Sequence, residues 1–366
     1  MINRLVFENL KHRKLRTGLS ALSIGFQVTM ILAVVGLSRG MLQDSINRAK
    51  GAGADIWVKP PGASAISLSG ASMPQKALGF FTKFPGVARA AGTVIQPIGG
   101  ISTITGVDYE QFSALSGSFK FVEGGPFQGP NDLIIDEWYA EQKKKKVGDT
   151  EKILNNDWRI CGIVQPGKLS RLFVPMARLQ EITNSQDKIS QVLLKVEDPK
   201  RTTAVIDALK KVPELEGYSI YSIEEFVSMF SFNNVPGLKA FIYVIIGLSI
   251  IVGFLVVGLT MYTTVLERTR EIGILKALGA SPGDVMGILV RETALLAIAG
   301  WLSGIVLSFG ANWAINRFVH ANLQSEITPD WWPLVLGIAL VASLLGAIYP
   351  GLRAARQDAI EALAYE

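Results

Sequence analysis

Residues 264–285, with the sequence TVLERTREIGILKALGASPGDV, lie between two long apolar runs and decide how the chain is organised. Charges open the stretch, and apolar residues at helical spacing follow them: Glu267, Arg268, Arg270 and Glu271, then Ile272, Leu275 and Leu278. Gly279 suits the left-handed residue that ends a helix, because glycine has no Cβ. Ser281, Pro282 and Asp284 have the spacing of an N-cap, a first helical position and a capping box. The stretch therefore predicts a helix, a sharp break and a new helix just beneath a membrane.

Within this stretch, residues 267–281 (ERTREIGILKALGAS) resemble the signature cytoplasmic loop of FtsX-like ABC-transporter permeases, the MacB and LolC/LolE group of type VII transporters. In that family the loop is the coupling helix that docks into an ATPase. The resemblance implies an ATPase-coupling set here: Glu267, Arg268, Arg270, Glu271, Ile272, Gly273, Leu275, Lys276, Leu278 and Gly279. Two simpler interpretations stay open. The whole segment could be an ordinary solvated loop beside the membrane. Separately, Gly273 could be a tolerated helix glycine, which costs about 1 kcal/mol relative to alanine, and not a residue that permits close approach of the ATPase.

Composition favours a membrane protein. The chain has 366 residues, of which 49% are hydrophobic, and they gather in a few long runs. The net charge of +5 does not indicate a nucleic-acid partner, because the basic residues flank the apolar runs, where they set membrane topology. A single cysteine, Cys161, excludes a disulfide within the chain, and two distant histidines, His12 and His320, supply a metal or catalytic site poorly.

The apolar runs predict an α-helical membrane protein with four transmembrane helices and a large α+β extracytoplasmic domain between helices 1 and 2. The expected segments are 1–39 (amphipathic start and first span), 40–236 (periplasmic domain), 237–266 (second span), 267–289 (coupling loop), 290–318 (third span), 319–333 (outer turn), 334–350 (fourth span) and 351–366 (tail). The first apolar run, 17–37, is too long for a typical signal peptide and is interpreted as an uncleaved span.

The region 40–236 has short alternating patterns and contains no run long enough to span a membrane. Strands are predicted at 55–59, at 94–107 as a pair broken at Gly99-Gly100, and at 133–135, 159–164 and 191–196, with a helix over 200–212. Residues 222–236 are interpreted as a helix-like lead to a break at Pro236-Gly237. Trp57, residues 106–108 and the segment 147–175 resemble the family's extracytoplasmic core domain.

Charge placement predicts the topology. Basic residues are dense at both ends and in the loop 267–289, whereas the turn between the third and fourth spans has only Arg317. Positive-inside reasoning places both termini and the loop in the cytoplasm, with the domain outside. The resemblance implies that the membrane is a bacterial inner membrane. Trp331 and Trp332 fit an outer aromatic belt.

Small residues at four-residue spacing predict close helix packing in lipid: Gly36, Gly40, Gly300, Gly304, Ser308, Ala339, Ser343 and Ala347. The resemblance implies a dimer, with a second copy or a paralogue, meeting mainly through spans one and two. The C-terminal residues 349–363 are similar to the family's closing motif, but Ala359 stands where proline is common and Tyr365 where arginine is frequent.

Several kinds of chemistry are absent. No GxxxxGK[ST] phosphate loop occurs, so the chain is expected to be a non-catalytic subunit without cofactors, with ATP and Mg bound by a partner ATPase. The lysine run 143–146 is interpreted as solvated surface, and Cys161 as a buried, unreactive residue. Asp55, Asp108 and Asp136 stand singly without an evident partner. The span centres lack ionisable residues, which argues against an ion-driven carrier.

Two functions are consistent with these patterns. The first is the permease subunit of an ABC transporter, which the resemblance implies couples ATP hydrolysis by a separate ATPase to mechanical motion of its periplasmic domain. It would export or extract a hydrophobic substrate such as a lipid, lipoprotein, peptide or drug. Its expected partners are a separate ATPase, a second permease chain, a periplasmic adaptor and membrane lipids. The alternative is a transmembrane signalling scaffold that activates a periplasmic partner such as a cell-wall hydrolase without transport. Crosslinking of the outer partner would distinguish the two, because an adaptor or lipid acceptor would support the first and a hydrolase the second.

Overall fold

The computed structural model describes residues 14–63, 71–99, 102–231, 233–235, 237–318 and 325–356. The predictions for the amphipathic start, for Pro236 and for the closing motif after residue 356 lie outside the described residues. The chain forms two compact units. Of the described residues, 14–40, 237–318 and 325–356 form one unit, here called the membrane unit, and those between 41 and 235 form the other, here called the sheet domain.

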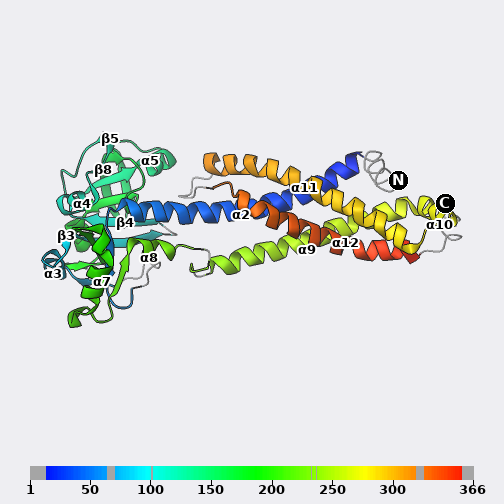
Figure 1. Ribbon diagram of the computed structural model, residues 1–366. Helices are drawn as coiled ribbons and strands as arrows, with labels where there is room; N and C mark the ends of the chain where they lie inside the picture. Colours follow the sequence, from blue (N-terminus) through cyan, green and yellow to red (C-terminus); the bar gives the residue numbers. More distant parts are fainter. Residues whose placement is uncertain are drawn as a thin grey trace. The chain divides into compact units, whose positions relative to one another are not determined.

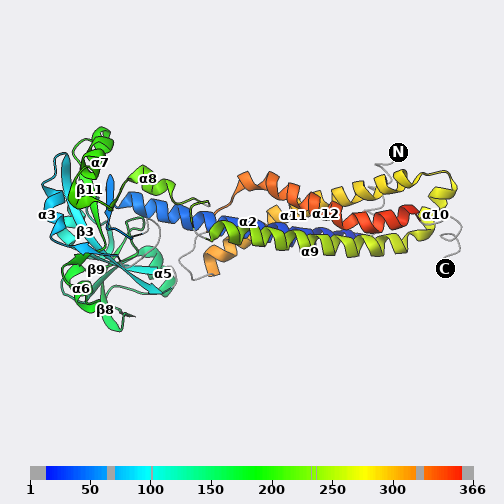
Figure 2. The ribbon, with the colours of Figure 1, turned by 90° about the horizontal axis from the view of Figure 1, so that it is seen from below.

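The membrane unit consists mainly of four long helices, counted over the described residues, each apolar and long enough to cross a bilayer. They are α2 (Lys14–Gly51), α9 (Leu238–Glu267), α11 (Pro282–Phe318) and α12 (Trp332–Arg356), with the short helix α10 (Thr269–Ala277) between α9 and α11 and the 3-10 turn η3 (Pro329–Trp331) before α12. The long helices run side by side, and the beginning of α2 and the end of α12 lie at the end of the bundle where α10 is found (Figures 1 and 2). The predicted fold class is confirmed.

Three helices are longer than the apolar runs that predicted them. The first continues from the run 17–37 to Gly51, the third begins at Pro282, and the fourth continues through Pro350 to Arg356. Hydropathy marks only the part of a helix that lies in lipid, so the polar extensions of α2 and α12 gave no such signal. The start of α11 at Pro282 was predicted by the capping residues instead.

Small residues make the close helix contacts. A Cβ on Gly300 would lie 2.5 Å from Ile24, and one on Gly304 would lie 2.5 Å from Val28, so α11 packs directly on α2. A Cβ on Gly346 would lie 2.6 Å from the carbonyl oxygen of Phe254, which brings α12 equally close to α9. The absent side chains allow backbone contact that larger residues would prevent.

The other predicted packing residues have different surroundings. Ser308, Ala339, Ser343 and Ala347 are buried, as is Gly40. Gly36 packs against the outer turn and not against another helix, because a Cβ there would lie 2.3 Å from the carbonyl oxygen of Glu326. The Glu326 amide also donates a hydrogen bond of 3.1 Å to the Gly36 carbonyl. The outer turn is therefore attached to α2.

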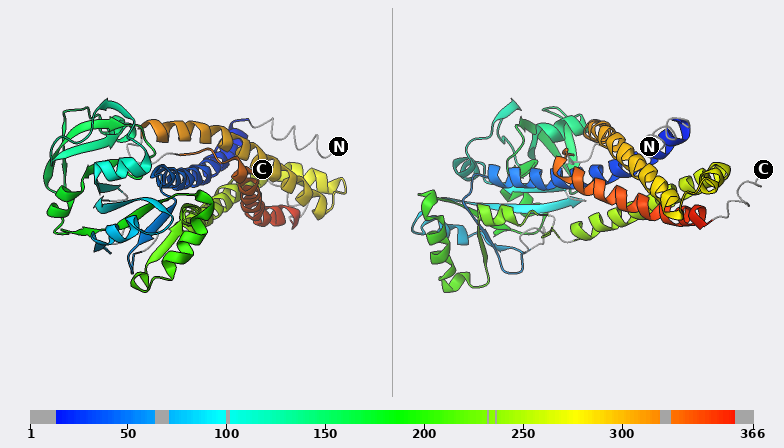
Figure 3. Two further views of the ribbon diagram at one scale, coloured as in Figure 1. Left: turned by 60° about the vertical axis from the view of Figure 1, so that its left-hand side comes forward. Right: turned by 45° about the vertical axis from the view of Figure 1, so that its right-hand side comes forward.

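The sheet domain, seen from two further sides in Figure 3, contains one large mixed sheet. Its strand order is β12-β1-β11-β3-β4-β9-β6-β8-β5, and β7 pairs with β8. Most pairs are antiparallel, and β4–β9 and β6–β8 are parallel. The strands are β1 (Ile56–Lys59), β3 (Val87–Gly99), β4 (Ser102–Val107), β5 (Phe121–Gly124), β6 (Asp132–Asp136), β7 (Thr150–Ile153), β8 (Asn156–Val164), β9 (Leu172–Pro175), β11 (Gln191–Val196) and β12 (Ser219–Ser222). A small second sheet pairs β2 (Met73–Pro74) with β10 (Lys188–Ile189).

Helices cover both faces of the large sheet. Alternate residues of β1 enter different apolar clusters, Ile56 and Val58 with α3, α6 and α7, and Trp57 with α4, α8 and the end of α2. The helices are α3 (Ala77–Thr82), α4 (Tyr109–Ser116), α5 (Glu137–Lys143), α6 (Met176–Ile182), α7 (Thr202–Lys210) and α8 (Ile223–Ser228), with 3-10 turns η1 (Pro199–Arg201) and η2 (Pro213–Leu215).

The expected strands and the helix near 200–212 are present. The helix predicted over 222–236 is shorter, because α8 ends at Ser228. Gly237 has a left-handed backbone (φ 78°) and begins α9, as the predicted break requires.

Candidate functional site

The residues between α9 and α11 form two sharp breaks around α10. The Thr269 hydroxyl donates to the carbonyls of Val265 and Leu266 at the end of α9. After α10, Gly279 adopts φ 96°, its amide donates to the Lys276 carbonyl (2.9 Å), and the Ala280 amide donates to the Leu275 carbonyl (3.0 Å). These two bonds form a Schellman motif, which satisfies carbonyls that the helix end leaves open.

The next helix begins with a reciprocal capping box. The Ser281 amide donates to the Asp284 carboxylate (2.9 Å), and the Asp284 amide donates to the Ser281 hydroxyl (3.2 Å). The predicted helix, break and new helix are confirmed, and the caps at both breaks set the direction of α10.

One face of α10 is exposed. Arg270, Ile274 and Leu278 recur at four-residue spacing, with Glu271 beside them. The exposed fractions are 81% for Leu278 and 46% for Ile274. We call these four residues the outer face of α10. Two large apolar side chains next to two opposite charges make a surface suited to a protein partner.

The opposite face of α10 is held by the chain itself. Ile272 and Gly273 are buried, and the Lys276 ammonium donates a 2.7 Å hydrogen bond to the Ala355 carbonyl near the end of α12. Cations are favourable at the negative end of a helix, so Lys276 joins α10 to α12.

Arg268 lies between α9 and α10 and joins them to α11. Its guanidinium is 3.2 Å from the Glu292 carboxylate of α11 and 3.0 Å from that of Glu271. The Arg268 side chain is only 13% exposed and that of Glu292 only 5%. Breaking such a buried pair leaves an uncompensated charge, so the pair holds α10 firmly to α11.

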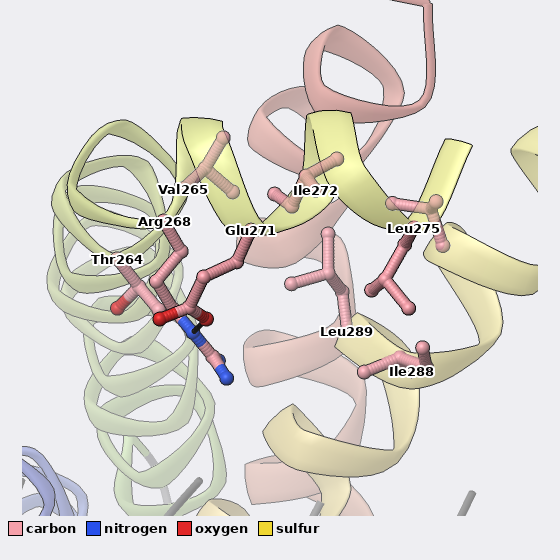
Figure 4. Close-up of a pocket in the computed structure, with 9 residues that line it drawn as sticks. Thr264, Val265, Arg268, Glu271, Ile272, Leu275, Ile288 and Leu289 are labelled. Carbon is pink, nitrogen blue, oxygen red and sulfur yellow. Dashed lines mark hydrogen bonds and ion pairs between the residues drawn. The ribbon is translucent and has the colours of Figure 1, made fainter. Parts of the chain in front are cut away.

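A cavity of about 200 Å³ lies beneath α10, beside this ion pair. Figure 4 shows the Glu271 carboxylate and the Arg268 guanidinium meeting on one side of it, with Ile272, Leu275 and Leu289 along the other. The apolar lining comes from α9, α10 and α11 together, so the cavity depends on how these helices are held.

The predicted coupling residues therefore divide into two groups. Arg270 and Leu278 lie on the outer face, and Glu267 and Gly279 are also exposed. Glu271 belongs to both groups, because its side chain is exposed and also pairs with Arg268 at the edge of the cavity. Arg268, Ile272, Gly273, Leu275 and Lys276 contact the chain's own helices or line the cavity.

Sequence reasoning missed Ile274 and Glu292. The sequence does contain a signal for Ile274, because it lies four residues from both Arg270 and Leu278. Glu292 follows Arg291 at the start of an apolar run, where a lone acidic residue indicates a buried partner.

Chemistry outside α10 is sparse. No group of three or more metal-binding side chains occurs among the residues that the structure describes. Cys161 is half-buried and not fully buried as predicted, and burial raises the pKa of its thiol to about 12. In the lysine run, Lys145 is engaged by Glu151 at 2.8 Å.

The prediction that three aspartates lack partners was wrong. Asp55 is 2.9 Å from the Lys195 ammonium, and Asp108 accepts a hydrogen bond from the Gln111 amide as the N-cap of α4. Asp136 caps α5 in the same way. The Asp55 pair spans 140 residues of sequence, so no local pattern reveals it.

Comparison with known proteins matches both units. Residues 243–359 match the family described as FtsX-like permease C-terminal, and residues 17–212 match the MacB-like periplasmic core domain. The macrolide export ATP-binding/permease protein MacB of Escherichia coli is 21% identical over 395 residues, covering 99% of this chain and 60% of that protein. The uncharacterized ABC transporter permease YknZ of Bacillus subtilis is 32% identical over 207 residues, covering 54% of this chain and 50% of YknZ.

Among solved structures, the periplasmic region of MacB from Actinobacillus actinomycetemcomitans aligns with 14% identity and a TM-score of 0.38, covering 48% of this chain and 92% of that chain. The chain spans between half and three fifths of the length of the two curated relatives above. Because the two family matches cover the first helix, most of the sheet domain and the last three membrane helices, the chain belongs to the MacB-like group of FtsX-type ABC-transporter permeases.

Proposed function

We propose that this chain is the permease subunit of an ABC transporter and that a separate ATPase subunit docks on the outer face of α10. The observation that carries the proposal is the exposed stripe of Arg270, Ile274 and Leu278 on a helix whose other face is held by the chain itself. A rigid helix with exposed apolar side chains loses little conformational freedom on binding.

The contacts of α10 support a role in transmitting movement. Arg268 ties it to α11 through Glu292, and Lys276 ties it to the end of α12. A push on the outer face therefore reaches both helices through buried or hydrogen-bonded contacts and not through a loose loop.

The nucleotide chemistry is assigned to the partner. MacB of Escherichia coli carries both ATP-binding and permease in its name, whereas the sequence here contains no phosphate loop. We assign ATP and Mg to a separate ATPase, and place α10 and both termini in the cytoplasm of a bacterial inner membrane, in agreement with the basic residues.

The remaining partners follow from the same assignment. A second permease chain, the same or a paralogue, would complete a dimer, and an adaptor would bind outside the membrane. The cargo would be a hydrophobic molecule such as a lipid, lipoprotein, peptide or drug. The lack of an ionisable side chain in the middle of the spans favours handling outside the inner membrane or in its outer leaflet.

Co-purification of the full chain with its candidate ATPase in detergent tests the docking face. We expect Leu278→Asp to weaken the complex by about 2 kcal/mol or more, roughly 30-fold. Val122→Asp is the matched control, since Val122 is an apolar side chain of the sheet domain that is 54% exposed. Equal retention by both variants would show that the outer face is not the dock. Failure of the wild type to retain any ATPase would overturn the transporter proposal.

A further inference from the structure

The last turns of α2 are built into the sheet domain (Figures 1 and 2). Ala49 and Ala52 are buried in the apolar cluster that also contains Trp57 and Phe173. A Cβ on Gly51 would lie 1.7 Å from the Gly167 carbonyl oxygen, so the helix end is in direct contact with backbone. This segment of α2 is therefore packed tightly in the core of the sheet domain.

Four charged side chains lie close together beside this end of α2. The Arg171 guanidinium is 3.0 Å from the Asp44 carboxylate of α2 and 3.8 Å from the Asp136 carboxylate at the end of β6. The Arg48 side chain, one turn after Asp44, is 3.1 Å from the same Asp44 carboxylate. The Arg171 guanidinium also lies over the Trp138 ring, 4.9 Å from its centroid. We call Asp44, Arg48, Asp136 and Arg171 the α2 charge cluster.

Three members of the cluster are buried, and its charges balance. Side-chain exposure is 8% for Asp44, 7% for Arg171 and 3% for Asp136, against 24% for Arg48, and the two positive charges match the two negative ones. Removing one member leaves a buried charge without compensation, which is far more costly than losing a surface pair.

The geometry gives the cluster a role that the apolar contacts cannot fill. Apolar packing is non-directional, so alanines alone would let α2 slide or rotate by small amounts. The Arg171 guanidinium donates a directional hydrogen bond of 3.0 Å to the Asp44 carboxylate of α2 and forms a longer ion pair of 3.8 Å with Asp136 of β6. It therefore adds a directional restraint on the rotation and axial position of this end of α2 to the packing at Gly51.

We propose that Arg171 is the positioning residue that couples movement of α2 to the sheet domain. The inference rests on the proposed function, because it needs a driven movement of the membrane helices, but the connection between α2 and the sheet domain is itself tested without an ATPase. Arg171 directly precedes β9, and its carbonyl accepts a 3.0 Å hydrogen bond from the Asp136 amide, so its backbone belongs to the sheet. Its side chain holds α2 through Asp44, and the domain then follows this end of the helix.

Pulsed EPR on the full chain measures how firmly the end of α2 is held in the sheet domain; we call this connection the joint. Spin labels at Gln43→Cys on the exposed side of α2 and at Asp157→Cys on the exposed start of β8, in a Cys161→Ala background, report how firmly α2 is held. We expect one narrow distance distribution in the wild type and loss of that narrow peak in Arg171→Met. Arg159→Met is the matched control, since Arg159 pairs with Asp132 at 2.8 Å and neither residue belongs to α2.

A double variant separates positioning from stability. Asp44→Asn with Arg171→Met leaves Arg48 and Asp136, so the buried charges balance again. We expect its unfolding temperature to recover relative to Arg171→Met, while the broad distance distribution persists. Recovery of both properties would show that Arg171 acts only through stability and would overturn the proposal, as would a narrow distribution in Arg171→Met itself.

The same variants with the bound ATPase complete the test. We expect Arg171→Met to retain ATP hydrolysis but to lose the nucleotide-dependent change in a distance between the two labelled sheet domains of a dimer. Retention of that change would overturn the proposal. If the wild type binds no ATPase, the proposed function fails, and the joint is decided by the distance distributions alone.

Discussion

The outer face of α10 and the embedded end of α2 differ in which side chains they expose and which they bury. On α10 the apolar residues Ile274 and Leu278 are exposed while the Arg268–Glu292 pair is buried. At the end of α2 the alanines and the charge cluster are both buried, with backbone in contact at Gly51. Under the proposed function the ATPase covers the first surface, whereas the second is already buried in the folded chain.

The largest expected effect tests how tightly the end of α2 packs in the sheet domain. Gly51→Ala places a methyl group 1.7 Å from the Gly167 carbonyl oxygen, so the backbone itself must move. We expect the free energy of unfolding of the sheet domain to fall by about 3 kcal/mol or more. The measurement is the unfolding temperature of the full chain, which should be lower. Gly79→Ala is the control, because a Cβ there meets nothing within 4 Å. Equal stability of the two variants would mean that the end of α2 is loosely seated.

Two isoleucines on α10 test its two faces. Ile272 is 8% exposed and packs inward, whereas Ile274 is 46% exposed. We expect Ile272→Ala to cost about 2–4 kcal/mol of stability, because it creates a cavity. Ile274→Ala should change stability by less than about 0.5 kcal/mol, since surface substitutions are usually mild.

Affinity for the ATPase should rank the two variants differently. Titration of the ATPase onto the detergent-solubilised chain is expected to show weaker binding for Ile274→Ala and unchanged binding for the folded fraction of Ile272→Ala. A loss of affinity in the second variant alone would place the dock on the inward face.

The sequence predicts these two regions unequally. The ends of α10 are encoded locally, because Gly279, Ser281 and Asp284 each act on residues within four positions. Hydropathy finds the four spans because lipid requires apolar side chains over the whole span. The α2 charge cluster is invisible in the same terms, since Asp44 and Arg171 are separated by 127 residues and meet only through the fold. Ile274 has helical spacing from Arg270 and Leu278, but the set that the resemblance implies, which contains residues of both faces, does not include it.

The pH dependence of the sheet domain tests the cluster with a smaller effect. Burial raises the pKa of Asp136 from its ordinary value of 3.8 to about 6, against the opposing influence of Arg171. Between these values the folded state binds the proton more tightly than the unfolded state, so this group's contribution to stability falls as pH rises through about 6.

Asp136→Asn removes that dependence and keeps an oxygen that can accept from the Tyr139 amide. The unfolding temperature of the variant minus that of the wild type should therefore rise with pH across this window. The subtraction cancels the carboxylates that both proteins share. A difference that falls with increasing pH would mean that Arg171 lowers the pKa of Asp136 more than burial raises it.

A small loss of stability is expected from substitutions at the break after α10. Gly279 has φ 96°, and a Cβ there would meet nothing within 4 Å, so only backbone strain opposes a substitution. Gly279→Ala should cost about 1 kcal/mol, since left-handed backbone is unfavourable for residues with a Cβ. Gly279→Asn should cost less, because asparagine tolerates this conformation better. Thermal unfolding of the full chain ranks the three proteins, and titration with the ATPase shows whether the strain is felt at Leu278. If alanine and asparagine reduced ATPase affinity equally without affecting stability, Gly279 itself would be in contact with the partner, and the outer face of α10 would extend past its last turn.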